Sequence, residues 1–133
     1  MKRICIDTNV WSALLAGDKR VSKVLAECEA VLVSSVVTGE LFDGFSGGSR
    51  NRENREIFER FCAKPRSIRI PVTETTAEWY AHIKQALRKK GRPIPVNDIW
   101  IAANCMEHGA CLVSFDAHFT AVDGLMVYNP DSD

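Results

Sequence analysis

Short apolar runs alternate with helix-like segments along the whole chain, and this alternation limits the folds open to it. The runs have the length and composition of buried strands, and they fall at residues 2–6, 30–33, 67–70, 110–113 and 125–128. Strands joined through helices pair in parallel, because a parallel crossover needs a connection about as long as a helix. We therefore predict an α/β domain of three layers, α/β/α, around a central parallel sheet of four to five short strands.

The segments between the runs carry the periodicity and the end signals of helices. Apolar residues recur there at intervals of three and four, and Gly17, Pro65 and Gly109 fall where helices are expected to end. The expected helices span residues 8–15, 20–28, 36–45, 51–62, 75–90 and 97–107.

Length and composition favour one domain. The chain has 133 residues, 46% of them hydrophobic, which is enough for one ordinary core. We expect a single domain over residues 1–129 and a frayed tail over residues 130–133. Five cysteines without a Cys-x-x-Cys pair argue against a disulfide framework. No apolar run approaches the ~20 residues of a membrane span, and no cleavage site follows the first strand, so we expect a cytoplasmic protein.

Charge is distributed unevenly along a chain whose formal net charge is zero. Residues 50–92 hold 12 Lys and Arg against 5 Asp and Glu, and the remainder holds 5 against 12. A basic segment beside an acidic remainder suits a protein that binds phosphates and also collects metal ligands. The alternative is that these cations are only solvated helix faces. The candidates for contact with a phosphate backbone are Arg50, Arg52, Arg55, Lys89, Lys90 and Arg92.

Four acidic residues stand near the expected ends of strands. Asp7 directly follows the first run, and Asp116 lies just past the run at 110–113. Glu40 falls in the helix after the second run, and Asp98 opens the apolar helix near residue 97. Because ligands bind outside the carboxyl ends of parallel strands, this topology can bring the four acids to one edge.

Four carboxylates in one cleft repel one another unless cations neutralise them. Oxygen ligands without Cys or His suit Mg²⁺ or Mn²⁺. Such ions activate water and stabilise the charge that develops on a phosphodiester. The acids therefore indicate metal-dependent phosphodiester hydrolysis.

Each acid also has a purely structural interpretation when it is taken alone. Asp7 and Asp98 suit the first turns of helices, Glu40 suits a solvated helix face, and Asp116 suits a turn. These interpretations explain the set less well, since Glu40 lies among apolar neighbours and Asp98 opens an apolar helix.

Four blocks of the sequence resemble the PIN-domain ribonucleases, and more narrowly the VapC-type toxins of bacterial type II toxin–antitoxin systems. The order and spacing of the blocks follow the family over nearly the whole chain. The blocks are Ile6–Val10, Ser34–Leu41, Pro95–Ala103 and Leu112–Phe119.

The resemblance implies a PIN-like nuclease domain that acts as an Mg²⁺- or Mn²⁺-dependent endoribonuclease. It implies that the four acids bind one or two ions and carry catalysis. Supporting roles fall to Thr8, Asn9, Asn97 and Ser114. His118 stands where the family varies, and we expect a structural or rim role for it. Asp123 replaces the more usual Pro, which affects only the shape of a loop.

The resemblance also implies partners. Members of the family act on RNA, form homodimers and are held inactive by a cognate antitoxin, which inserts a tail, often with an Arg, towards the acids. Contact with DNA is then indirect, through the antitoxin. Core packing is the favoured interpretation for at least half of the residues that could line that interface. These residues are Trp11, Leu14, Leu15, Phe42 and Phe45.

Other functions stay open at this point. One is a catalytically inactive PIN-like module that binds RNA, and another is a DNA-directed nuclease of the same fold. A third is a phosphatase with an aspartate nucleophile, which requires Asp-x-Asp after the first strand. This chain has Asp7-Thr8-Asn9 there and lacks the second acid.

Overall fold

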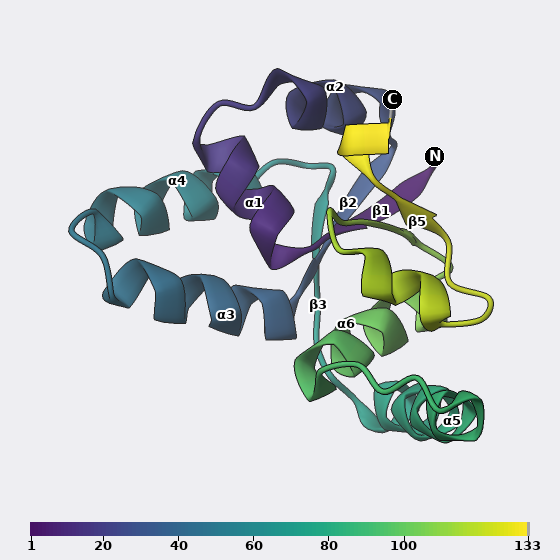
Figure 1. Cartoon of the computed structure of the whole chain (residues 1–133). Helices are drawn as coiled ribbons and strands as arrows, with labels where there is room; N and C mark the ends of the chain where they lie inside the picture. Colours follow the sequence, from purple (N-terminus) through teal and green to yellow (C-terminus); the bar gives the residue numbers. More distant parts are fainter. Residues whose placement is uncertain (133) are drawn as a thin grey trace.

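A five-stranded parallel sheet forms the centre of the protein in the computed structural model, which describes residues 1–132 (Figure 1). All four strand pairings are parallel, and the strand order is β3-β2-β1-β4-β5. The first strand therefore lies in the middle, with a hydrogen-bonded neighbour on each side. The strands are β1 (Arg3–Ile6), β2 (Ala30–Ser34), β3 (Ser67–Ile70), β4 (Cys111–Val113) and β5 (Val127–Tyr128).

Six α-helices connect the strands, and their bounds agree with the sequence prediction to within one or two residues. In the view of Figure 1, α1 to α4 lie to one side of the strands and α5 and α6 to the other, which gives the predicted α/β/α layers. Among the described residues no helix has both the length and the apolar character that crossing a bilayer requires. The helices are α1 (Thr8–Leu15), α2 (Lys19–Glu27), α3 (Ser35–Ser46), α4 (Asn51–Cys62), α5 (Glu74–Lys90) and α6 (Val96–Glu107).

Side-chain caps fix where several helices begin. Asp18 accepts a hydrogen bond from the Arg20 amide, 2.9 Å away, at the start of α2. Ser34 ends β2 and caps α3, since its hydroxyl accepts from the Val36 amide at 3.2 Å. Such caps satisfy amides that have no partner within the helix. The turn from β2 into α3 is thereby held tightly, and with it the first turns of α3.

The core holds the first helix firmly against its neighbours. Trp11 of α1 is 1% exposed and meets two aromatic rings of α4 edge to face, Phe58 at 5.2 Å and Phe61 at 4.7 Å between ring centroids. Edge-to-face pairs add to the stabilisation from burial alone. This packing fixes the start of α1, immediately after the end of β1.

A buried polar network ties α6 to β2 and to α5. The Asn104 side chain, fully buried, accepts a hydrogen bond from the Ser34 hydroxyl at 2.7 Å and donates to the Glu107 carboxylate at 2.9 Å. The Thr76 hydroxyl donates to the same carboxylate at 2.5 Å. Because buried polar groups without partners are costly, this network permits only one register of α6.

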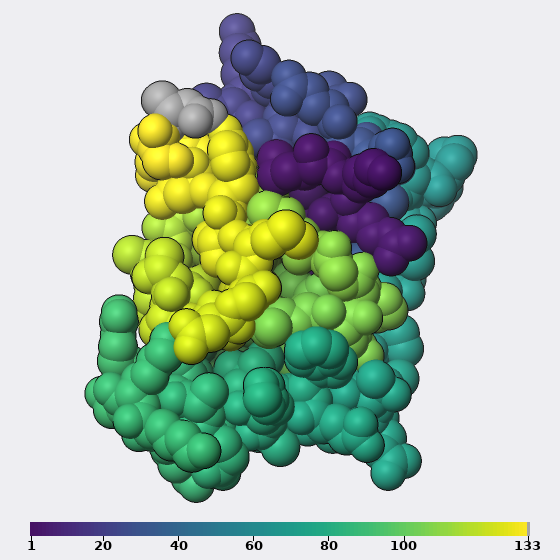
Figure 2. Space-filling model, turned by 90° about the vertical axis from the view of Figure 1, so that its right-hand side faces the viewer, coloured from purple at the N-terminus to yellow at the C-terminus, as the bar shows by residue number. Residues whose placement is uncertain are grey.

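The prediction of a frayed tail over residues 130–133 is wrong for residues 130–132. Pro130–Ser132 forms a short 3₁₀ helix, η2, in which Pro130 is buried. Asp131 makes an ion pair with Arg20 of α2, a contact that links residues far apart in the sequence. Figure 2 shows the C-terminal segment, in yellow, packed against the N-terminal part of the chain. Asp133 lies outside the described residues.

We predict that Asn104→Ala lowers the free energy of unfolding by about 2 kcal/mol, because it leaves Glu107 and Ser34 buried with fewer partners. Denaturant unfolding of the purified chain measures the change. Gln85→Ala, an exposed amide in α5, is the matched control and should shift stability by less than ~0.5 kcal/mol. Equal effects of the two substitutions would show that the network does not stabilise the fold.

Candidate functional site

Asp7 lies at the middle of the carboxyl edge of the sheet. Its amide donates to the Val113 carbonyl at 3.0 Å, which continues the pairing of β1 with β4 by one residue. The residue is 5% exposed, and its carboxylate accepts from the Thr8 amide at 2.8 Å and caps α1. The structural interpretation of Asp7 as a helix cap is therefore correct, and the carboxylate also contacts residues that follow β4.

Ser114 joins Asp7 to Asp116. Its hydroxyl donates to Asp7 Oδ2 at 2.8 Å and accepts from the Asp116 amide at 3.0 Å. Ser114 is fully buried directly after β4, where only groups within the protein are available as partners. One hydroxyl thus sets the orientation of one acid and the backbone position of the other.

Glu40 reaches the same edge from α3. Its Oε1 accepts from the Thr8 hydroxyl at 2.6 Å, and its Oε2 accepts from the Asn97 side-chain amide at 3.4 Å. These donors stand beside Asp7 and Asp98 in the sequence. Glu40 is therefore not simply a solvated helix residue, because its carboxylate is held between the first turns of α1 and α6.

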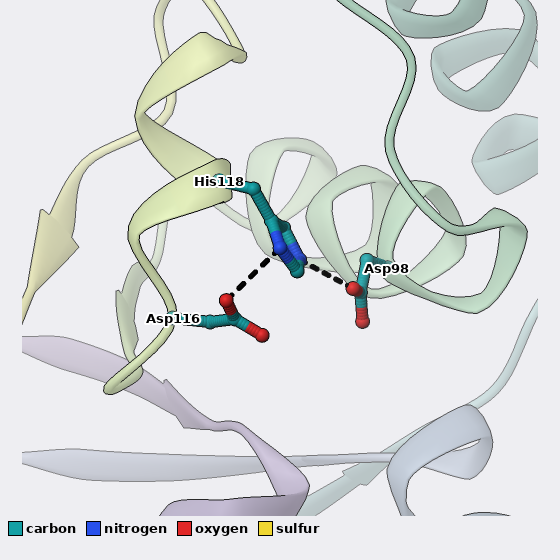
Figure 3. A group of neighbouring side chains, drawn as sticks. All are labelled: Asp98, Asp116 and His118. Carbon is teal, nitrogen blue, oxygen red and sulfur yellow. Dashed lines mark hydrogen bonds and ion pairs between the residues drawn. The ribbon is translucent and has the colours of Figure 1, made fainter.

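Asp98 lies in the first turn of α6, opposite the short 3₁₀ helix η1 (Ala117–Ala121). Figure 3 shows the His118 ring between the carboxylates of Asp98 and Asp116. His118 Nε2 is 2.5 Å from Asp98 Oδ2, and Nδ1 is 2.9 Å from Asp116 Oδ1.

The prediction gave His118 a structural or rim role. Its ring contacts two of the four acids, Asp98 and Asp116, and these contacts were not predicted. The available signal was its position two residues after Asp116, since a tight turn there brings both side chains to the same edge.

Contacts and sequence neighbours link the four predicted acids at one edge of the sheet. Glu40 contacts Thr8 and Asn97, which directly follow Asp7 and precede Asp98, respectively, in the sequence. Ser114 joins Asp7 to Asp116, and His118 joins Asp116 to Asp98. Of the predicted supporting residues, Thr8, Asn97 and Ser114 take part. Asn9 does not, because its side chain is exposed on α1 and makes no hydrogen bond within residues 1–132.

The electrostatics of this cluster favour a bound cation. Burial raises the pKa of Asp7, and the charges of Asp98 and Glu40 add to the rise, against hydrogen bonds from Ser114 and Thr8. Burial also raises the pKa of Asp98, with Glu40 and Asp116 adding to it and His118 opposing it. A divalent ion among these oxygens would relieve both the desolvation and the repulsion. The donor set therefore fits a hard divalent cation.

The six basic candidates form two separate groups. Arg50, Arg52 and Arg55 lie at the start of α4, where Arg50 lines a groove of about 380 Å³ together with Thr8 and Glu40. The second group is Lys89, Lys90 and Arg92, at the end of α5 and just after it.

Local contacts already occupy several of these cations. Arg50 pairs with Glu53 at 2.6 Å, and the Arg55 guanidinium lies 3.5 Å from the centre of the Phe42 ring. Lys90 donates to Asp123 at 2.6 Å. Of the six candidates, Arg50 is the one that lines a groove together with one of the acids, Glu40.

Trp11 and Phe45, two of the five predicted interface residues, are buried, which agrees with the core-packing interpretation. The other three, Leu14, Leu15 and Phe42, are half-buried. Trp11, Leu14 and Leu15 line a cavity of about 400 Å³ between α1, α2 and α4.

Comparison with known proteins places this site in a family. The PIN domain profile matches residues 4–125. Ribonuclease VapC2 of Rickettsia felis is 26% identical over 113 residues, which are 82% of this chain and 81% of that protein. Ribonuclease VapC5 of Mycobacterium tuberculosis is 33% identical over 55 residues, 41% of each chain.

Solved structures agree with the fold. The structure of VapBC2 from Rickettsia felis, bound to a DNA fragment from its promoter, superposes with a TM-score of 0.84 at 23% identity and covers 96% of this chain and 98% of that one. FitAcB from Neisseria gonorrhoeae superposes with a TM-score of 0.76 at 27% identity, covering 96% and 97%.

The raised pKa of Asp7 leads to a stability prediction. The folded state holds the Asp7 proton more tightly than the unfolded chain does, so this residue destabilises the fold as the pH rises above its ordinary pKa of 3.8. In a chelator, Asp7→Asn should therefore raise the free energy of unfolding at pH 7 by about 1 kcal/mol, and the gain should shrink towards pH 4.

Denaturant unfolding at the two pH values measures this difference. Asp43→Asn, on the exposed face of α3, is the control and should show no comparable gain. A gain for Asp7→Asn that is as large at pH 4 as at pH 7 would contradict the prediction.

Proposed function

The chain belongs to the PIN-domain family, and on that premise we propose that it is a divalent-metal-dependent endoribonuclease of the VapC type. We propose that it acts as the toxin of a toxin–antitoxin pair. The observation that carries the proposal is the set of contacts through Thr8, Asn97, Ser114 and His118 that gathers Asp7, Glu40, Asp98 and Asp116 at one edge of the sheet.

The four carboxylates would hold Mg²⁺ or Mn²⁺. A bound ion of this kind supplies positive charge that activates water and offsets the charge developing on a phosphodiester. Thr8 and Asn97 orient the Glu40 carboxylate, and Ser114 orients the Asp7 carboxylate, before any ion binds. A site fixed in advance in this way needs little reorganisation during the reaction.

An RNA substrate is favoured by the curated relatives, which are named ribonucleases. The intact set of four acids argues against an inactive RNA-binding module. DNA is the alternative substrate, for which the chain would be a DNA-directed nuclease of the same fold. A phosphatase with an aspartate nucleophile is disfavoured, since Asn9 stands at the position of the second acid and its side chain is exposed.

We predict that the chain cleaves single-stranded RNA in Mn²⁺ or Mg²⁺ and that excess EDTA abolishes cleavage. Asp7→Asn and Asp98→Asn should each lower the rate at least ~100-fold, because each removes a negative oxygen from the cation site. A labelled RNA and a labelled DNA of the same sequence, resolved on a gel, measure rate and substrate together.

Asp43→Asn is the control for these variants and should retain full activity. Circular dichroism checks that the variants are folded. Undiminished cleavage by Asp7→Asn, or by the wild type in EDTA, would refute the metal site. Cleavage of the DNA alone would favour the alternative substrate.

The basic candidates would bind the RNA backbone on both sides of the acids. Arg50 is the best placed of them, since it shares a groove with Glu40. Lys90 is the least available, because Asp123 and the Ala121 carbonyl already accept from its amine, at 2.6 and 2.8 Å.

We predict that replacing all six basic residues by Gln weakens RNA binding and flattens its dependence on salt, since each phosphate contact releases counterions. Binding is measured in EDTA, where RNA stays uncut, between ~50 and ~200 mM salt. Lys19→Gln and Lys23→Gln on α2 serve together as the control. If the RNA affinity of the sixfold variant depends on salt as steeply as that of the wild type, these residues do not contact the RNA backbone.

The cavity between α1, α2 and α4 is the surface that we propose for the antitoxin. Its apolar walls include Leu14 and Ile57, and Lys64 and Arg66 stand at its lining. An antitoxin segment with apolar side chains and acidic flanks would complement this surface.

The remaining parts of the proposal follow from the toxin role. Structures of relatives carry the names of two-component VapBC complexes, one of them bound to promoter DNA. We propose a homodimer with a cognate antitoxin, which alone contacts DNA. We also propose that the chain acts in the cytoplasm, where its RNA substrate is found.

A further inference from the structure

We propose that His118 supplies a nitrogen ligand to the divalent cation and thereby biases the site towards transition-metal ions over Mg²⁺. This inference rests on the proposed function, since it concerns the same cation site. It adds a ligand of a different chemical class to the four carboxylates.

The first argument is position. One ligand atom from each of Asp98, Asp116 and His118 lies within 4.8 Å of the other two. Figure 3 shows the imidazole between the two carboxylates, with a nitrogen facing each of them. Nε2 lies 2.5 Å from Asp98 Oδ2, and Nδ1 lies 2.9 Å from Asp116 Oδ1. One ion can bind only one of the two nitrogens, and each of them has a carboxylate oxygen near the ~3 Å that separates neighbouring ligands around an octahedral ion with bonds of ~2.1 Å.

The second argument is that the fold holds the imidazole there. His118 follows Asp116 within the 3₁₀ helix η1, and its neighbour Phe119 is fully buried and anchors that helix in the core. The centres of the His118 and Phe119 rings are 5.0 Å apart. The histidine side chain keeps 32% of its exposure, so an ion can reach it from solvent.

The third argument is ligand chemistry. Mg²⁺ takes oxygen ligands almost exclusively and keeps several of its waters. Imidazole nitrogen is a good ligand for first-row transition ions. A ligating histidine also commonly donates its other N–H to a carboxylate, which fixes the ring. With one nitrogen on the ion and the other on a carboxylate, His118 would fit that arrangement.

A competing explanation is that His118 only orients the carboxylates by hydrogen bonds, as Ser114 orients Asp7. Both explanations predict that losing His118 affects the site. They differ in whether nitrogen is bonded directly to the ion, and electron spin echo modulation of bound Mn²⁺ detects that bond through its coupling to ¹⁴N.

The experiment uses the full chain loaded with Mn²⁺, with His118→Ala and His118→Gln as the variants. His82→Ala is the matched control, because His82 is an exposed histidine on α5. Calorimetry with Mn²⁺ alone and with Mg²⁺ alone gives the ratio of the two affinities for each protein.

We expect nitrogen modulation in the wild type and in His82→Ala, and its loss in both His118 variants. The ratio of Mn²⁺ to Mg²⁺ affinity should fall about tenfold on loss of His118, the size typical for removing one group that binds or orients a metal. His118→Gln keeps an oxygen in place of nitrogen and should retain Mg²⁺ binding, which also shows that the site is still folded.

Two results would overturn the inference and leave the proposed function standing. One is Mn²⁺ bound to the wild type without nitrogen modulation, and the other is an equal loss of affinity for both ions in His118→Ala. If the wild type binds neither ion, both this inference and the metal-dependent function are wrong.

Discussion

Repulsion among four carboxylates at the end of β1 is the constraint on which this structure depends. Burial strengthens that repulsion, and it raises the pKa of Asp7 and of Asp98. The fold holds the acids in place through the side chains of Thr8, Asn97, Ser114 and His118. Thr8, Asn97 and Ser114 are uncharged, so they orient carboxylates without replacing a cation. The arrangement is therefore suited to bind a cation from solution, which would neutralise the negative charge of the acids.

The sheet order explains how such distant residues meet. Because β1 lies between β2 and β4, the residues that follow these three strands share one edge. Asp98 arrives differently, at the start of a helix on the other side of the sheet. Its position depends on α6 being held in one register, which the buried contact between Asn104 and Ser34 provides. Ser34 also caps α3, so one side chain sets the positions of both Glu40 and Asp98.

Local sequence patterns predicted the elements and the four acids because each depends on near neighbours in the chain. Strand runs, helix periods and caps are properties of short windows, and the acids were found by their positions after strands or within the helices that follow. The contact of His118 with Asp98 and the packing of the C-terminal segment were not predicted, for the opposite reason. The contact of His118 with Asp98 spans 20 residues, and the pair of Arg20 with Asp131 spans 111. No short window contains both members of either pair.

The positive charge of residues 50–92 also looks different in the folded chain than in the sequence. Its excess of cations overstates the free positive surface, because Arg52 pairs with Glu56 and Arg69 with Glu59 in the folded chain. Such pairs between exposed side chains contribute little, about 0–1 kcal/mol, and are screened by salt. A phosphate can therefore replace the carboxylate partner with little loss. Arg50, which pairs with Glu53 and lines the groove with Glu40, then stays available to a nucleic acid.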